Sequence, residues 1–309
     1  MKKTFFLFLS FWAIVSCKND INTLINNNKE IKFSKQTISS KIDFTTSKNI
    51  FTQLPGVEYV VVKSPITFIK CTFEDTIKAY SLTKENGVYC DFEQPIVFLN
   101  CKFKKPVIFN QSTFRKSVVF ANCQFEDVAY FQGCTFIDKI TDFKENNYDT
   151  NAFFNNSTFY GNANFFKSNF IKNANFDYIN VGQIFSIASS QFEQKFSCSY
   201  SIFKDRFIAS YCVFKENSHL TENIFWGRAE MFKFISKKHF DINQNIFYNK
   251  FIVSQSTIDG FFEMKYNKFI YQNFVSEKIN FLNTSQKQID SNYVWQNINS
   301  NFFDKKDNK

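Results

Sequence analysis

The chain has 309 residues, 37 Lys and Arg against 28 Asp and Glu, a formal net charge of +9 and 45 Phe, but only 7 Gly and 4 Pro. The abundance of Phe excludes a disordered or collagen-like chain, and the length suffices for a large buried core. Only two His are present, which leaves little material for imidazole chemistry.

The N-terminal segment is typical of an export signal. Lys2 and Lys3 precede an apolar stretch that runs from Phe5 to Val15 and contains a single Ser. A stretch of this length is too short for a permanent transmembrane helix but suits the apolar region of a signal peptide. We therefore predict a signal peptide over residues 1–16.

Residues 14–17, Ile-Val-Ser-Cys, resemble the lipobox of bacterial lipoproteins. In that family the Cys is acylated and becomes the new N-terminus. The resemblance implies lipid attachment at Cys17, and the attached chains would hold the protein at a membrane because each buried CH₂ contributes about 0.8 kcal/mol. The alternative is an ordinary cleaved signal that happens to end near a Cys.

Residues 17–50 are rich in Asn, Ser, Thr and Lys and poor in aromatic residues. We predict that they form the lipidated Cys and a flexible tether, because such a segment buries too little apolar surface to order itself. Lys18 and Asn19 follow the Cys without an Asp, which favours the outer membrane by resemblance to lipoprotein sorting rules. Whether the domain faces the periplasm or the exterior is left open. No later segment has the roughly 18 apolar residues of a spanning helix.

An internal repeat dominates residues 96–136. Phe recurs there at alternating steps of 5 and 6 residues, which sum to 11, and a small or aliphatic residue stands two positions before each Phe. After an insertion predicted at residues 144–151 the repeat resumes one residue out of phase, and from residue 192 onward steps of 4 and 7 keep the same sum. The predicted core ladder consists of Phe98, Phe103, Phe109, Phe114, Phe120, Phe125, Phe131 and Phe136.

These steps match neither the spacing of an amphipathic helix nor the alternation of a plain strand. The triplet small-x-Phe nevertheless has a local period of two, so both side chains point to one face of a short extended segment. The polar residues that follow each triplet would turn a corner, where Asn is well suited. A chain that repeats this pattern winds into a solenoid with Phe stacked inside.

The repeat of residues 96–136 resembles the pentapeptide-repeat superfamily, in particular its branch with alternating steps of five and six residues. The resemblance implies an all-β fold, a right-handed parallel β-helix with four sides and about 22 residues per coil. We predict this β-solenoid over residues 51–281, with loops at residues 74–90 and 144–151.

A solenoid exposes strand edges at both ends, so it requires caps. Residues 50–65 are the candidate for the N-terminal end. Residues 275–305 are the candidate for the other end, and residues 282–309 are assigned as C-terminal cap and tail.

The cysteines are predicted to be small interior residues. Discounting Cys17, six of them precede a Phe by two positions: Cys71, Cys90, Cys101, Cys123, Cys134 and Cys212. Cys101 and Cys123 would lie on adjacent coils, but their parallel Cβ vectors fit disulfide geometry poorly. Apolar packing is therefore favoured over a disulfide framework.

No metal site, cofactor site or catalytic motif is predicted. His219 and His239 have no Cys or carboxylate near them at the sequence spacing of a metal site. Four carboxylates cluster near the predicted insertion: Asp127, Asp138, Asp142 and Glu145. We interpret them as solvated charges at the corners of the coil. The alternative is that they serve as catalytic carboxylates of a polysaccharide-cleaving β-helix enzyme.

Removal of residues 1–16 would take away Lys2 and Lys3 and leave a formal charge of +7. Some pentapeptide-repeat proteins mimic DNA with an acidic surface and bind topoisomerases, which a basic, exported chain does not fit. Nucleic acid is not expected as a partner, whereas anionic lipid head groups or acidic glycans are compatible with the charge.

Taken together, the sequence predicts a lipid-anchored scaffold or binding protein of the cell envelope that presents a rigid surface without catalysis. Its expected partners are the membrane, through the N-terminal lipid, and an unknown protein or glycan. The alternative is a carbohydrate-active β-helix enzyme of the envelope.

Overall fold

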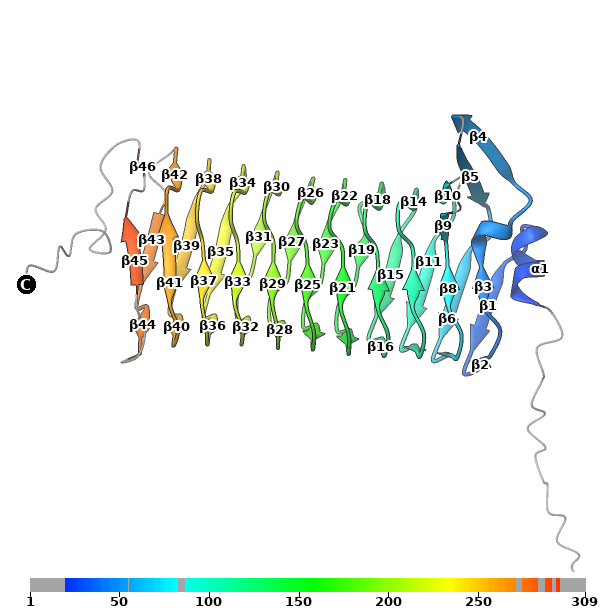
Figure 1. Cartoon of the computed structure of the whole chain (residues 1–309), viewed down its shortest axis with the longest axis horizontal. Coiled ribbons are helices and arrows are strands. Elements are labelled where there is room, and N and C mark those ends of the chain that lie inside the picture. Colours follow the sequence, from blue (N-terminus) through cyan, green and yellow to red (C-terminus); the bar gives the residue numbers. More distant parts are fainter. Residues whose placement is uncertain are drawn as a thin grey trace, which may run out of the picture.

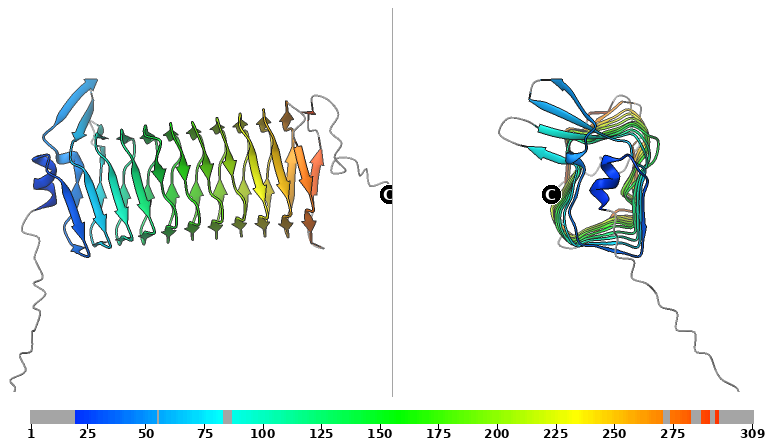
Figure 2. Two further views of the ribbon diagram at one scale, coloured as in Figure 1. Left: turned by 180° about the vertical axis from the view of Figure 1, so that it is seen from behind. Right: turned by 90° about the vertical axis from the view of Figure 1, so that its right-hand side faces the viewer.

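The computed structural model describes residues 20–54, 56–82, 87–270, 274–282, 287–290 and 293–294. They form an elongated solenoid of short strands (Figure 1), in which partners on most successive coils from β11 onward are 22 residues apart. Four sheets, called A to D here, form the walls of a four-sided tube (Figure 2). The prediction of an all-β, four-sided parallel β-solenoid with about 22 residues per coil is confirmed.

The parallel sheets A to C contain 11 strands each. Sheet A consists of β1 (Ile31–Ser34), β6 (Ile66–Ile69), β11 (Ile96–Leu99), β15 (Val118–Ala121), β19 (Thr141–Asp142), β23 (Ala163–Asn164), β27 (Phe185–Ser186), β31 (Phe207–Ile208), β35 (Ala229–Phe232), β39 (Phe251–Ser254) and β43 (Phe274–Glu277). Sheet B consists of β2 (Thr37–Ile38), β7 (Thr72–Phe73), β12 (Lys102–Phe103), β16 (Gln124–Phe125), β20 (Asn147–Tyr148), β24 (Asn169–Phe170), β28 (Gln191–Phe192), β32 (Val213–Phe214), β36 (Ile235–Ser236), β40 (Thr257–Ile258) and β44 (Asn280–Phe281). Sheet C consists of β3 (Ile42–Asp43), β8 (Ile77–Lys78), β13 (Val107–Ile108), β17 (Ala129–Tyr130), β21 (Ala152–Phe153), β25 (Ala174–Asn175), β29 (Phe196–Ser197), β33 (Ser218–His219), β37 (Phe240–Asp241), β41 (Phe262–Lys265) and β45 (Lys287–Asp290).

Sheet D has 13 strands, because two antiparallel hairpins extend it at the N-terminal end. It consists of β4 (Ile50–Leu54), β5 (Val57–Val62), β9 (Tyr80–Leu82), β10 (Gly87–Phe92), β14 (Thr113–Phe114), β18 (Thr135–Phe136), β22 (Thr158–Phe159), β26 (Asn180–Val181), β30 (Ile202–Phe203), β34 (Ile224–Phe225), β38 (Ile246–Phe247), β42 (Lys268–Phe269) and β46 (Tyr293–Val294).

The predicted Phe residues are all buried and stack along the tube. Phe98 stacks on Phe120 in sheet A with ring centroids 4.6 Å apart, and Phe114 stacks on Phe136 in sheet D at 4.9 Å. Phe103 stacks on Phe125 in sheet B, and Phe109 stacks on Phe131 beside sheet C. The rings therefore form four ladders, one inside each wall. Successive rings of one ladder are 22 residues apart in these coils, because 11 residues lead from one wall to the opposite wall.

The change from steps of 5 and 6 to steps of 4 and 7 residues reflects an exchange of large and small side chains between two inward positions. Strands of sheets A and C have two inward positions, and up to β25 the first holds a small or aliphatic residue and the second a ring, as in Ala174 and Phe176. From Phe185 onward the ring usually takes the first position and a smaller residue the second, as in Ile187. The tube keeps a nearly constant interior volume, which dense packing requires.

The phase shift comes from one extra residue between Phe136 and Thr141. Val118 pairs with Thr141, and partners across this coil are 23 residues apart. The predicted insertion at residues 144–151 is wrong, because these residues form a regular corner and strand β20. Tyr148 takes the place of a Phe there and is fully buried. The loop predicted at residues 74–90 is correct only for the β9–β10 hairpin, since β8 belongs to sheet C.

The solenoid begins earlier than predicted. Strands β1, β2 and β3 add a first rung to sheets A, B and C, and residues 21–26 form a helix packed on the core, so the flexible tether predicted over residues 17–50 is wrong from residue 21 onward. Ile38 fills an inward position there that Phe73 occupies on the next coil. The short helix α1 (Ile21–Asn26) lies across the open end of the tube (Figure 2), with Ile21 and Ile25 buried against the core.

Two predicted caps also need correction. The β4–β5 hairpin projects from the side of the tube (Figure 2) instead of covering its end, so α1 and not residues 50–65 forms the N-terminal cap. Strands β45 and β46 continue the walls past the predicted boundary at residue 281. The signal peptide over residues 1–16, Cys17 and the tail after residue 294 lie outside the described residues. Among the residues that are described, no helix is long and apolar enough to cross a membrane.

Buried polar side chains line two corners of the tube. They occupy the small position before the rings of sheets B and D, and most of them bond backbone atoms of a neighbouring coil, although Ser112 Oγ has no hydrogen-bond partner. Ser157 Oγ donates to Phe131 O at 2.8 Å, and Cys134 Sγ donates to Phe109 O at 3.0 Å. Small polar or polarisable side chains are therefore common at these corners, whereas Ile179 and Phe234 fill the same position on β26 and β36 without such a bond.

Close contact between coils makes one glycine position testable. A Cβ at Gly227 would overlap the carbonyl oxygen of Asp205 on the preceding coil. Replacement of Gly227 with Ala is expected to destabilise the fold by about 1–3 kcal/mol. Urea denaturation followed by far-UV circular dichroism would measure this loss.

Gly133→Asn is the matched control. Gly133 has φ +66°, but Asn100 and Asn156 hold the same left-handed conformation at other corners, and a Cβ at Gly133 meets only the flexible Gln111 side chain. An equal loss from Gly133→Asn and Gly227→Ala would contradict the contact between coils as the cause.

Candidate functional site

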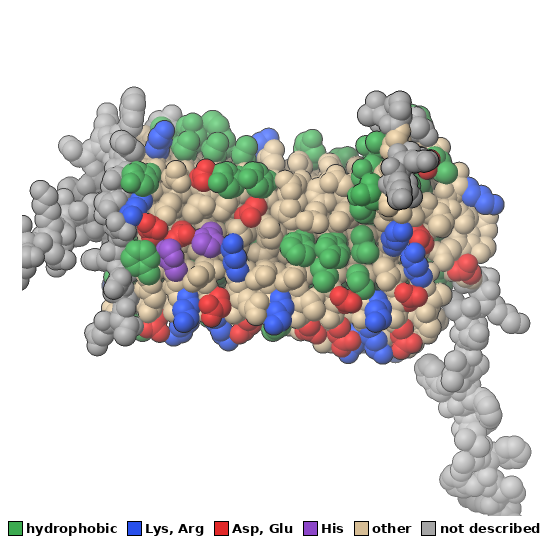
Figure 3. All heavy atoms as spheres, viewed as in Figure 1, with side chains coloured by type: hydrophobic (Ala, Val, Ile, Leu, Met, Phe, Trp, Pro, Cys, Tyr) green, Lys and Arg blue, Asp and Glu red, His purple; other side chains and the backbone are tan. Residues whose placement is uncertain are grey.

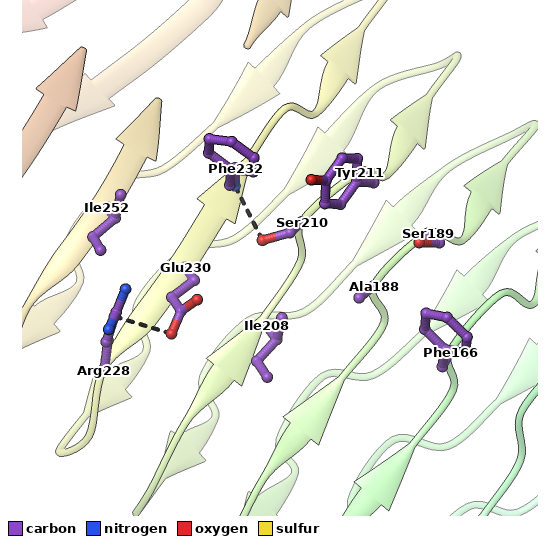
Figure 4. A pocket seen from close by; sticks show the side chains of 10 residues that line it. All are labelled: Phe166, Ala188, Ser189, Ile208, Ser210, Tyr211, Arg228, Glu230, Phe232 and Ile252. Atoms are coloured by element: carbon purple, nitrogen blue, oxygen red, sulfur yellow. Dashed lines mark hydrogen bonds and ion pairs between the residues drawn. The ribbon is translucent and has the colours of Figure 1, made fainter. Parts of the chain in front are cut away.

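A hollow on the outer face of sheet A is the most prominent candidate for a binding site. We call it the sheet A groove (Figure 4), and it is lined by Phe166, Ala188, Ser189, Ile208, Ser210, Tyr211, Arg228, Glu230, Phe232 and Ile252. Ile208, Glu230 and Ile252 are register partners on β31, β35 and β39, so the floor of the groove is a rigid ladder of outward side chains.

Charged groups surround the apolar floor. Glu230 Oε1 lies 2.9 Å from Arg206 Nη2 and 2.9 Å from Arg228 Nε, so two guanidinium groups share one carboxylate oxygen. Lys233 Nζ lies 5.1 Å from the centroid of the Phe232 ring and 5.7 Å from that of Tyr211. The groove thus combines aromatic rings with cations at cation–π distance.

A second exposed surface follows sheet D. Ile202, Ile224 and Ile246 are outward register partners there. Trp226, which is 51% exposed, stacks on Tyr248 with ring centroids 4.1 Å apart. Exposed apolar side chains therefore extend over two neighbouring walls of the second half of the solenoid, a distribution typical of interaction surfaces.

The four carboxylates of the enzyme alternative do not meet at one place. Asp142 is outward on sheet A, where it accepts from Asn164 Nδ2 and lies 3.2 Å from Lys144 Nζ. Asp127 precedes sheet C, Asp138 follows sheet D, and Glu145 is a corner residue with φ +57° after sheet A. They are therefore distributed around the coil.

The two histidines are closer to carboxylates than the sequence spacing indicated. Figure 3 shows them beside acidic side chains on one face of the solenoid. His219 Nδ1 lies 2.7 Å from Asp241 Oδ2, and His239 Nε2 lies 3.6 Å from Glu263 Oε2. The premise that the histidines lack carboxylate partners is wrong, because winding brings residues 22 positions apart into contact. A test of the sequence at that interval would have found His219, Asp241 and Glu263.

The seven described cysteines are all buried free thiols. Cys101 and Cys123 lie on adjacent coils, where Cys101 N donates to Cys123 Sγ at 3.4 Å. The Cys123 contact and burial raise the pKa of Cys101 to about 12, and burial raises the pKa of Cys212 to about 12. These thiols stay protonated and serve packing rather than nucleophilic chemistry.

A family model described as pentapeptide repeats (9 copies) matches residues 88–135 and 98–145. Comparison with curated proteins and with solved structures found no match. The matched segment covers the coils in which the alternating steps of five and six residues are most regular. Together with the geometry of the coils, the match identifies pentapeptide repeats within residues 88–145 of the solenoid.

Proposed function

We propose that the chain is a lipid-anchored, non-catalytic binding scaffold of the cell envelope, held at the outer membrane through Cys17. The lipobox-like residues 14–17 support the anchor. The observation that supports binding is the sheet A groove, where apolar and aromatic side chains are fixed in a ladder on a continuous wall.

The composition of the groove favours a protein partner. Tyr, Phe and Ile on a preorganised surface are typical of interface centres, where little side-chain entropy remains to be lost on binding. Arg206, Arg228 and Lys233 place positive charge at its margin. A segment with apolar side chains and an acidic group fits both features.

The anchor is tested by replacing Cys17 with Ser in the full chain. We expect the wild-type protein to incorporate a labelled fatty acid and to sediment with membranes, and Cys17→Ser to lose the label and become soluble. Lys18→Ser is the matched control and should remain membrane-bound. Sedimentation of Cys17→Ser together with the wild-type protein, or absence of the label from the wild-type protein, would contradict the anchor.

The binding surface is tested by site-specific photo-crosslinking in intact cells. A photoreactive residue at Ile208, in the groove, should give a discrete protein adduct, whereas one at Val213 on sheet B of the same coil should not. Phe232→Ser should weaken the adduct. Identical adducts from positions 208 and 213, or no adduct from position 208, would overturn the groove as the binding site while leaving the anchor unaffected.

A further inference from the structure

The outer face of sheet C carries a compact group of ionisable side chains near the C-terminal end of the solenoid. His219 on β33, Asp241 on β37 and Glu263 on β41 are direct register partners on three successive coils. His239 lies immediately before β37, two residues from Asp241. The rigid ladder thus fixes the backbone positions of all four side chains.

Three donor atoms converge at the centre of this group. They are Nε2 of His239, an oxygen of Asp241 and an oxygen of Glu263, and all lie within 4.8 Å of one another. His239 Nε2 is 3.6 Å from Glu263 Oε2 and is paired more closely with Asp241 Oδ1. One imidazole nitrogen and two carboxylate oxygens are a common protein donor set for transition metals.

Each carboxylate is held by its other oxygen. Asp241 Oδ2 lies 2.7 Å from His219 Nδ1, and Glu263 Oε1 lies 2.7 Å from Lys265 Nζ. These contacts leave Asp241 Oδ1 and Glu263 Oε2 directed toward His239. Outer partners that orient the ligands in this way are a regular feature of protein metal sites.

The two central atoms form a close ion pair with each other but have no hydrogen bond. His239 Nε2 and Asp241 Oδ1 are buried and make no hydrogen bond to any described residue, although they face each other. The Asp241 side chain is only 13% exposed. Buried polar atoms are rarely left in this state, and a cation between them would coordinate both.

We propose that His239, Asp241 and Glu263 bind a divalent transition-metal ion, best matched by Zn²⁺, with a fourth position open to water or to a group on a partner. Tetrahedral Zn²⁺ with ligands at about 2.0–2.2 Å requires donors separated by about 3.4 Å, close to the 3.6 Å between His239 Nε2 and Glu263 Oε2. His239 Nε2 and Asp241 Oδ1 are closer than this and have to separate when the ion enters. The nitrogen ligand and the small number of donors disfavour Ca²⁺. His219 and Lys265 act as positioning residues.

Isothermal titration of the tag-free protein with Zn²⁺ is the direct test. We expect one site per chain, with affinity reduced at least about 10-fold in His239→Ala and in Asp241→Asn. Glu193→Gln, which alters a carboxylate on sheet B paired with Lys215, is the matched control and should bind as the wild type does. Circular dichroism would verify that each variant is folded.

Titration of the wild-type protein with Co²⁺ supplies a test that requires no variant. We expect visible absorption of an intensity typical of four-coordinate Co²⁺, displaced by one equivalent of Zn²⁺. Absence of a saturable Zn²⁺ or Co²⁺ site in the wild-type protein, or equal Zn²⁺ affinity in folded His239→Ala, would overturn the proposal and reduce the group to a network of ion pairs.

Discussion

Replacement of Phe120 with Asp is expected to abolish the cooperative unfolding transition of the solenoid. The ring is fully buried, stacks on Phe98 at 4.6 Å and on Phe143 at 5.5 Å, and meets Phe131 edge to face at 5.4 Å. Loss of such a ring costs about 3–5 kcal/mol, and burial of a carboxylate without a partner adds several more. That sum is comparable to the total stability of an ordinary domain.

The matched control is Lys116→Asp, because Lys116 is an exposed corner residue on the same coil. Thermal unfolding followed by far-UV circular dichroism should show little change for Lys116→Asp and no cooperative transition for Phe120→Asp. Similar melting curves for the two variants would contradict the inward assignment of the ring.

The second large effect is expected at a corner amide. Asn245 is fully buried, its Nδ2 donates to Leu220 O at 2.8 Å, and its Oδ1 accepts from Asn223 N at 2.9 Å. Asn245→Leu preserves the approximate volume but leaves both backbone groups unsatisfied. The expected loss is about 2–6 kcal/mol, at about 1–3 kcal/mol for each of the two buried groups.

Asn217→Leu serves as the control for this substitution, because Asn217 is exposed. Surface substitutions of this kind change stability by about 0.5 kcal/mol or less. Urea midpoints would compare the two variants. A urea midpoint of Asn245→Leu equal to that of the wild-type protein would contradict a stabilising role for the hydrogen bonds of the corner amides.

The fold could be predicted from the sequence where Phe marks each wall, as at residues 96–136. The Phe pattern misses the first coil because Ile38 stands where the next coil has Phe73, and it misreads the regular coil around Tyr148 as an insertion because a single extra residue shifts the phase. Inward positions are specified by volume and burial rather than by one residue type. A pattern built on Phe alone therefore underestimates the length of the solenoid.

The candidate sites were largely invisible to sequence analysis. Outward residues such as Ile208 and Ile252 follow no repeat of their own, and their proximity depends on the register between coils. The same holds for His219, Asp241 and Glu263, whose interval of 22 residues has meaning only when the length of a coil is known. Local motif spacing cannot reveal a site that is assembled by winding.

In this fold each coil lies one strand spacing, or one rung, further along a straight tube than the coil before it. Electron–electron double resonance between spin labels on outward positions of sheet B tests it most directly, since the seven described thiols are buried. Lys102 and Gln191 are separated by four rungs and Lys102 and Thr257 by seven. At about 4.8 Å per rung, the expected backbone separations are about 19 Å and about 34 Å. Distances that fail to increase in proportion to the number of rungs would contradict the solenoid.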